Sequence, residues 1–115
     1  MSKVKEFTEY RLKMNKAILD GDNKVIKRIF SVDTMAYDPG ALSTKTKEML
    51  GLVSSLVLRC DDCVKYHLGK LSEIGSTNEE IHEVFSIAMI VGGTIVVPHT
   101  RRAVEFWNEL NQPNE

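Results

Sequence analysis

The chain has 115 residues and a formal charge of −1, the size of one domain without an electrostatic excess of either sign. Apolar residues make up 43% and charged residues 27%, as in globular proteins rather than disordered or fibrous ones. A nearly neutral chain has no charge excess to drive binding to nucleic acid or to an anionic membrane, so neither is expected as a partner. We therefore expect one globular domain over residues 1–115.

The sequence contains no recognisable targeting or membrane segment. Its longest uncharged stretch, residues 84–100, includes Ser86, His99 and a glycine pair, and falls short of the roughly 20 apolar residues of a spanning helix. The first six residues, MSKVKE, lack the apolar segment of a signal peptide, so we expect a cytoplasmic protein. The only two cysteines, Cys60 and Cys63, are not expected to form a structural disulfide in that reducing compartment.

Two amphipathic helices are predicted in the first third of the chain. An apolar stripe at three-four spacing lies within residues 4–19, and Gly21 is placed to end that helix. A second stripe lies within residues 25–36 and stops at residues 38–40, Asp-Pro-Gly, with residue 22 or 23 as the cap at its start. Each pattern predicts one apolar helix face that has to be covered.

Three further helices are predicted between residues 43 and 88. Ser43 can cap the first of them, and the next begins near Asp61 and ends at Gly75. These two helices form an antiparallel hairpin if the chain turns at residues 58–59. The sequence Thr-Asn-Glu-Glu at residues 77–80 is a capping box and predicts the start of the fifth helix.

In residues 90–97 a strand pattern competes with a helix pattern. Two apolar, mostly β-branched runs flank Gly92 and Gly93, which is a local signal for a β-hairpin. An isolated hairpin is marginally stable, and no other strand candidate is present to extend it. We therefore favour a helix that the glycines let approach its neighbour closely. We also expect the apolar segment 84–97 to be buried partly by another subunit. Pro98 then opens or kinks the last helix, which completes an all-α bundle of about six helices.

The cysteine pair stands at the predicted N-terminus of the fourth helix. There Cys60 and Cys63 could form a small disulfide loop, or remain thiols at the positive end of the helix dipole, where the thiolate is favoured. Arg59 acts in the same direction. Asp61 and Asp62 repel a thiolate unless their charges cap the helix. The sequence leaves open both the oxidation state and which electrostatic effect is larger.

His67 and Glu48 are the candidate proton-transfer residues. His67 follows Cys63 by four residues, one helical turn, and would therefore act more directly on Cys63 than on Cys60. If the chain turns at residues 58–59, Glu48 and His67 lie at similar heights, about 14–15 Å from the bend. A carboxylate facing the imidazole would fix its tautomer and complete a Glu–His–Cys relay.

The pattern Glu48-x11-Cys60-x2-Cys63-x3-His67 resembles the signature of the alkylhydroperoxidase AhpD-like proteins, within the carboxymuconolactone decarboxylase family. The similarity extends over most of the chain. It implies an all-helical fold with an antiparallel hairpin that carries the cysteines, assembly as a homotrimer or hexamer, and peroxide-reducing thiol–disulfide chemistry. The resemblance makes Cys63 the peroxide-attacking thiolate and Cys60 its resolving partner. Glu48 and His67 correspond to the proton relay.

The resemblance also suggests the partners of this chemistry. The substrate would be a small hydroperoxide or a disulfide, the reductant an external dithiol of lipoyl or thioredoxin-like type, and no cofactor or metal is expected. Asp62 is a departure, because better-studied members carry a histidine there and a carboxylate cannot replace an imidazole at neutral pH. The decarboxylase branch lacks the cysteine pair, so the pair argues against lactone decarboxylation.

Two other functions stay open from the sequence. One is a lyase of the carboxymuconolactone decarboxylase type, with Glu48 and His67 as acid and base. The other is a non-catalytic oligomer, purely structural or zinc-bearing, in which the cysteines and His67 bind zinc with Glu48, His82 or His99. Ligands on adjacent turns of one helix are an awkward arrangement for a tetrahedral site. His82 lies among glutamates and is expected at the surface, whereas His99 could line a cleft or an interface.

Overall fold

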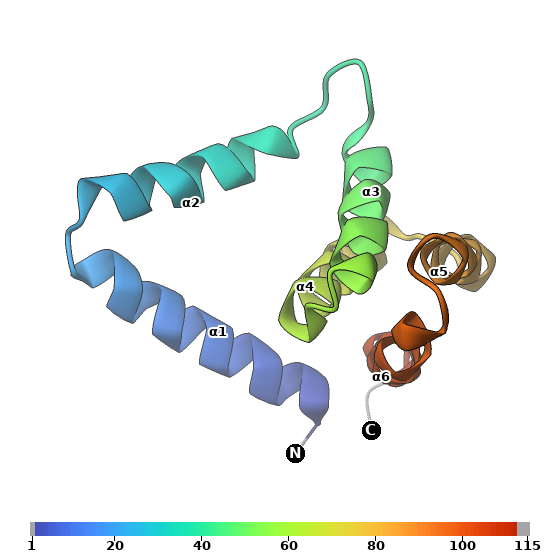
Figure 1. The fold of residues 1–115 in the computed structure, drawn as a ribbon. Helices are drawn as coiled ribbons and strands as arrows, with labels where there is room; N and C mark the ends of the chain where they lie inside the picture. The colour runs from blue at the N-terminus through green and yellow to red at the C-terminus, as the bar shows by residue number, and fades with distance from the viewer. Residues whose placement is uncertain (1, 113–115) are drawn as a thin grey trace. The chain divides into compact units, whose positions relative to one another are not determined.

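The computed structural model describes residues 2–112, and within them the chain is helical without a β-strand (Figure 1). The elements are α1 (Lys3–Asp20), α2 (Lys24–Ala36), α3 (Thr44–Val57), α4 (Asp61–Ile74), α5 (Asn78–Gly92), the 3₁₀ helix η1 (Thr94–Val96) and α6 (Val97–Leu110). The all-α prediction is thereby confirmed. In this described part of the chain, no helix combines the length and the apolar character needed to cross a membrane.

The helices fall into two compact units, with the boundary between Thr44 and Lys45. The first unit holds α1 and α2, and the second holds α4 to α6 with nearly all of α3. The single domain over residues 1–115 stays a prediction. The candidate site lies in the second unit.

The first unit is a pair of helices that share a contact but enclose no core. Asn23 caps α2 by accepting a hydrogen bond from the backbone N–H of Ile26, as expected for residue 22 or 23. No residue of α1 or α2 is buried. Four apolar side chains of α2 at helical spacing are 58–66% exposed: Val25, Ile29, Val32 and Met35. The predicted apolar face therefore exists, but two helices have too little volume to enclose it.

The second unit has an apolar core to which all four of its α-helices contribute. The core includes Leu52 and Leu56 of α3, Leu68 and Leu71 of α4, Ile81 and Phe85 of α5, and Phe106 and Trp107 of α6. Trp107 also donates its indole N–H to Asn78 Oδ1 at 2.7 Å, which ties α6 to the start of α5. Because α4 packs mainly against α6, the helix that begins at the cysteine pair is held on a packed support.

Local signals in the sequence set the helix ends around α4 and α5. α4 ends at Gly75, whose left-handed φ of 87° suits a residue without a Cβ. The predicted capping box is present: Glu80 N–H donates to Thr77 Oγ1 at 3.1 Å, and Thr77 N–H donates to Glu80 Oε1 at 2.9 Å. These signals fix where α4 stops and where α5 starts.

The segment 90–97 is a helix end rather than a hairpin. α5 continues to Gly92, the chain breaks at Gly93 with φ 84° and ψ −174°, and η1 leads into α6 with Pro98 in its first turn. A Cβ at Gly92 would collide with Val96 Cγ2 of η1 and lie in ordinary contact with Val57, so the predicted close packing is found at Gly92, whereas a Cβ at Gly93 would meet nothing within 4 Å.

Within residues 2–112 the apolar segment 84–97 is buried only in part: Val96 is buried, and cover of the rest by another subunit stays a prediction. Ile90, Val91 and Ile95 are 84%, 66% and 54% exposed. The helix pattern correctly indicated a one-sided apolar surface, but whether a side chain is covered depends on neighbours that local periodicity does not specify.

Candidate functional site

The turn between α3 and α4 brings the candidate residues into one place. Leu58 and Arg59 form it, and Arg59 adopts the left-handed conformation with φ 60°. The Cys60 N–H donates to the carbonyl of Ser55 at 2.9 Å, which closes the end of α3 and starts α4 beside it. The chain therefore reverses where the sequence predicted, and Glu48 on α3 faces His67 on α4.

Glu48 and His67 form a buried hydrogen-bonded pair. His67 Nδ1 lies 2.7 Å from Glu48 Oε1, and the two side chains are 8% and 3% exposed. Since a carboxylate can only accept, the contact places a proton on Nδ1, and in a neutral imidazole this leaves Nε2 as the atom that accepts a proton. The predicted contact is confirmed, and its geometry suits a base with a fixed tautomer.

Gly51 is a site residue that the sequence analysis did not single out. A Cβ at this position would lie 2.5 Å from Cε1 and 2.7 Å from Nε2 of His67. The imidazole therefore packs against the backbone of α3 in space that only a glycine leaves open. The signal was the spacing, since Gly51 is three residues after Glu48 and shares its helix face.

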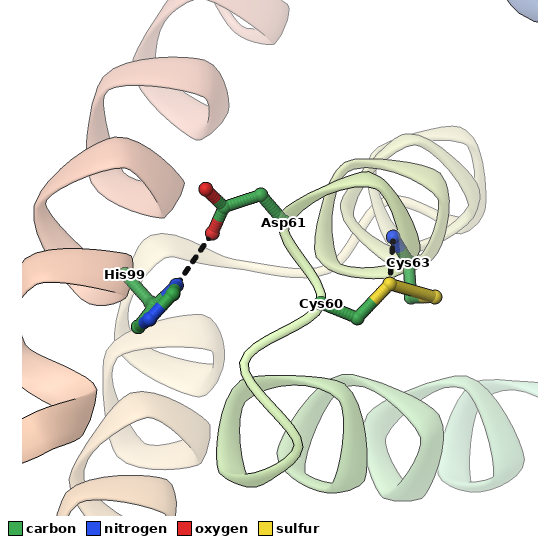
Figure 2. Close-up of a disulfide and its surroundings, with 4 residues drawn as sticks. All are labelled: Cys60, Asp61, Cys63 and His99. Atoms are coloured by element: carbon green, nitrogen blue, oxygen red, sulfur yellow. Dashed lines mark hydrogen bonds and ion pairs between the residues drawn. A yellow bond between two sulfur atoms is a disulfide. The ribbon is translucent and has the colours of Figure 1, made fainter.

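Cys60 and Cys63 are joined by a disulfide at the start of α4 (Figure 2). Cys60 is the N-cap residue, and its Sγ accepts a hydrogen bond from the Cys63 N–H at 3.3 Å. Cys63 is exposed and Cys60 is half-buried. The structure thus represents the oxidised form, and on reduction both sulfurs would lie at a helix N-terminus, where a thiolate is favoured.

Asp61, between the cysteines, is held by two residues of α6 that sequence reasoning did not connect to it. His99 Nδ1 lies 2.7 Å from Asp61 Oδ1 (Figure 2), and Arg102 Nε donates to Asp61 Oδ2 at 2.7 Å. Burial would raise the pKa of Asp61, but the hydrogen bonds from His99 and Arg102 and the charge of Arg102 outweigh it and hold this pKa below its ordinary value. The Asp61 carboxylate is therefore ionised and has a partner for its charge.

Asp62 differs from Asp61 in this respect. It is exposed, and within residues 2–112 it forms no ion pair with a cation. Asp62, where the sequence departs from the family pattern, therefore exposes its charge to solvent, whereas the charge of Asp61 is paired.

The remaining histidines do not gather around the cysteines into a zinc site. His82 is exposed, as expected, with its ring edge on Phe85, and His99 contacts Asp61. Across residues 2–112 no group of three or more His, Cys, Asp or Glu side chains could hold a metal ion. The ligand set considered for zinc is therefore not assembled in this form of the protein.

Comparison with known proteins identifies close structural relatives. A sequence model of the carboxymuconolactone decarboxylase family matches residues 24–106. A crystal structure of a Thermotoga maritima protein shares 50% identity and a TM-score of 0.89, over 92% of this chain and 93% of that chain. Another T. maritima structure, at 50% identity and a TM-score of 0.86, covers 91% of this chain and 89% of that one. It is described as a protein of the same family and a candidate for a part in the antioxidative response.

More distant relatives have the same fold or a similar sequence. A carboxymuconolactone decarboxylase family protein from Legionella pneumophila, at 22% identity, has a TM-score of 0.89 over 97% of this chain and all of that chain, which shows the fold alone. An uncharacterised protein of Cupriavidus necator is 28% identical over 76 residues, which are 66% of this chain and 67% of that protein.

Proposed function

Because the chain belongs to the carboxymuconolactone decarboxylase family and carries a disulfide beside a buried Glu–His pair, we propose that it is a thiol–disulfide oxidoreductase that reduces hydroperoxides. The observation that carries this proposal is the 2.7 Å contact between Glu48 and His67, one helical turn from Cys63. The antioxidative role suggested for the T. maritima relative points in the same direction.

In the reduced protein, Nε2 of His67 takes the proton of the Cys63 thiol while Glu48 holds the ring. The thiolate attacks one peroxide oxygen, so an S–O bond forms and the O–O bond breaks. The departing alkoxide receives the proton from His67 and leaves as an alcohol, and Cys63 becomes a sulfenic acid. The peroxide is thus reduced by two electrons that come from one sulfur.

Cys60 resolves this intermediate. Its thiol condenses with the Cys63 sulfenic acid, the S–S bond forms and one water molecule leaves. An external dithiol of lipoyl or thioredoxin-like type then reduces the disulfide by two electrons and is itself oxidised to a disulfide. The cycle needs no bound cofactor, and we place it in the cytoplasm because a reducing compartment supplies such dithiols.

Counting thiols before and after peroxide treatment tests the cycle. The reduced protein should have two free thiols, and one equivalent of hydroperoxide should remove both and restore the Cys60–Cys63 disulfide. Retention of both thiols would contradict the proposal, and turnover of a carboxymuconolactone by such a protein would favour the lyase instead.

The two cysteine variants assign the roles and are matched controls for each other. In Cys63→Ser, consumption of hydroperoxide should cease. In Cys60→Ser, one equivalent of hydroperoxide should be consumed, and the resulting sulfenic acid can be trapped with a dimedone reagent and located by mass spectrometry. Wild-type turnover in both variants would exclude a cysteine mechanism.

His67→Gln tests the base, with His82→Gln on the exposed face of α5 as its control. The first should lower the rate of Cys63 alkylation at neutral pH, because the thiol has lost its proton acceptor. The second should leave that rate unchanged. Equal rates in the two folded variants would remove His67 from the proposed relay.

The proposed working particle is a homo-oligomer, a trimer or hexamer. The exposed apolar stripe of α2 and the exposed apolar end of α5 are surfaces that a second copy of the chain could cover. Light scattering should give a mass several times that of the chain, and Ile29→Glu should lower it. A monomeric wild-type protein would contradict this part of the proposal.

A further inference from the structure

On the premise of the redox cycle proposed above, we propose that Arg102 and His99 are positioning residues for the cysteine pair. Arg102 neutralises the Asp61 carboxylate and His99 holds its other oxygen, and together they keep Asp61 from suppressing formation of the Cys63 thiolate. They also fix the start of α4 to α6. The inference rests on an ion-paired cluster at the one residue that lies directly beside Cys60 and within two residues of Cys63.

The geometry of this cluster is specific. Asp61 Oδ1 lies 2.7 Å from His99 Nδ1, and Arg102 Nε donates to the other oxygen, Oδ2, at 2.7 Å. Arg102 Nη2 also lies 3.1 Å from His99 Nδ1. Each carboxylate oxygen of Asp61 thus has its own donor, and both donors come from α6, 38 and 41 residues further along the chain.

His99 acts on the sulfurs through Asp61 rather than directly. Figure 2 shows the Asp61 side chain pointing toward His99, while the sulfurs of Cys60 and Cys63 lie on the opposite side of the Asp61 backbone. A role as the base that deprotonates either thiol is therefore not what this geometry supports. Its effect is on the charge and the position of Asp61.

The other charged side chains near the cysteines do not compensate the Asp61 carboxylate in place of Arg102. On α4 itself, Asp62 is exposed, and the Lys65 ammonium lies 5.9 Å from the centre of the Phe106 ring. Arg59, in the turn before the pair, is exposed. Without Arg102, Asp61 and Asp62 would be two uncompensated negative charges between the two thiols in the sequence. Like charges this close to a sulfur disfavour its thiolate.

A double-mutant cycle on Arg102 and Asp61 tests the inference in the reduced protein. The readout is the pH dependence of Cys63 alkylation by iodoacetamide, followed by mass spectrometry, which gives the thiol pKa without requiring any peroxidase activity. Arg102→Gln should raise this pKa by up to about one unit, because Asp61 is then uncompensated. Asp61→Asn should lower it, because Arg102 is then the uncompensated charge.

In the double variant Asp61→Asn/Arg102→Gln the pKa should return to near the wild-type value. Arg101→Gln removes the same charge from the neighbouring exposed position of α6 and should change the pKa much less. His99→Gln should shift the pKa upward by less than Arg102→Gln, since it removes one hydrogen bond to Asp61 but leaves the Arg102 charge in place. Arg102→Lys should restore part of the wild-type pKa, because the positive charge is retained.

The opposite signs separate an electrostatic role from a merely structural one. If Arg102→Gln and Asp61→Asn shift the pKa in the same direction, or neither shifts it, the inference is wrong. Should Arg102→Gln fail to fold, Asp61→Asn against the double variant still gives the sign of the Arg102 effect. If the Cys63 pKa shifts as expected in these variants but the protein never consumes peroxide, the proposed function is refuted, whereas the charge balance between Asp61 and Arg102 is still supported.

Discussion

Two histidine–carboxylate pairs flank the disulfide, and they share one contact length in different surroundings. Glu48–His67 and Asp61–His99 are both joined at 2.7 Å through Nδ1. The side chains of the first pair are at most 8% exposed, whereas Asp61 and His99 are 35% and 18% exposed and Arg102 completes their cluster. Contact distance alone therefore does not reveal what a pair does.

Because the two pairs differ in burial, we expect them to contribute differently to stability and to the charge around the cysteines. Water and salt partly screen the more exposed pair, Asp61–His99, so it adds little stability and acts chiefly through the charge it presents to its neighbours. A buried pair is screened much less, and removing one partner leaves the other as an unpaired polar or charged group inside the protein. The buried pair should thus be the more sensitive of the two to substitution.

Glu48→Gln should have the largest effect. It removes the carboxylate charge from the buried pair while keeping its shape, so we expect peroxide turnover to fall by about 100-fold or more. The free energy of unfolding should fall by roughly 1–3 kcal/mol. Steady-state kinetics and urea denaturation measure the two effects, with Glu83→Gln on the exposed face of α5 as control. Unchanged turnover in the folded variant would mean that the buried pair is only structural.

Gly51→Ala tests the space around the same imidazole without touching its partner. The added Cβ would lie 2.5 Å from Cε1 of His67, so the ring has to move and its bond to Glu48 should weaken. We expect about a 10-fold loss of turnover. Gly69→Ala on α4 is the matched control, because a Cβ there meets nothing within 4 Å and should stabilise the helix by up to about 1 kcal/mol. Equal kinetics in the two variants would show that the ring position is not critical.

Asp62→Asn extends the comparison to an exposed carboxylate that forms no ion pair with any of the residues described in the structure. Removing this exposed charge should increase the alkylation rate of Cys63 at neutral pH by about threefold, since thiolate formation is no longer opposed. The substitution should also lower the stability of α4 slightly, because an acidic residue in its first turn stabilises the helix by about 0.5 kcal/mol. A slower rate in this variant would show that Asp62 assists the thiol chemistry.

Acid titration should show the smallest effect. The pKa of Asp61 is lower in the folded protein than in the unfolded chain, so its ion pairs add stability above about pH 4, and this is lost as the pH falls through the lowered pKa. Because Asp61 is 35% exposed, we expect the loss to stay below about 1 kcal/mol. The stability difference between wild type and Asp61→Asn should shrink over that acid range. A difference that grows would contradict the sign.

Much of this architecture could be predicted because its signals are local. Gly75 ends α4 and the Thr77–Glu80 capping box opens α5, and each depends only on residues within one turn. The contact between Glu48 and His67 required one further step, the reversal at residues 58–59. Its prediction succeeded because two helices joined by a short turn bring positions equally far from the bend to the same height.

What sequence reasoning missed depends on tertiary packing. The cluster of Asp61, His99 and Arg102 exists because α6 packs on α4, and no local pattern specifies which helices become neighbours. Periodicity likewise predicted the apolar face that carries Ile90 and Val91 but not what covers it, so its predicted cover by another subunit stays a prediction. The role of Gly51 could have been inferred once the helix face that carries Glu48 was known to meet His67.

The Cys60–Cys63 bond closes a ring of only four residues, and this limits how strongly folding depends on oxidation. By chain-entropy reasoning such a ring restricts the unfolded chain by about 2 kcal/mol, compared with about 4.7 kcal/mol for a loop of 100 residues. The two oxidation states should therefore differ modestly in their melting behaviour. A bond that constrains the unfolded ensemble so little can open and close at the start of α4 while the core formed by α3 to α6 stays assembled.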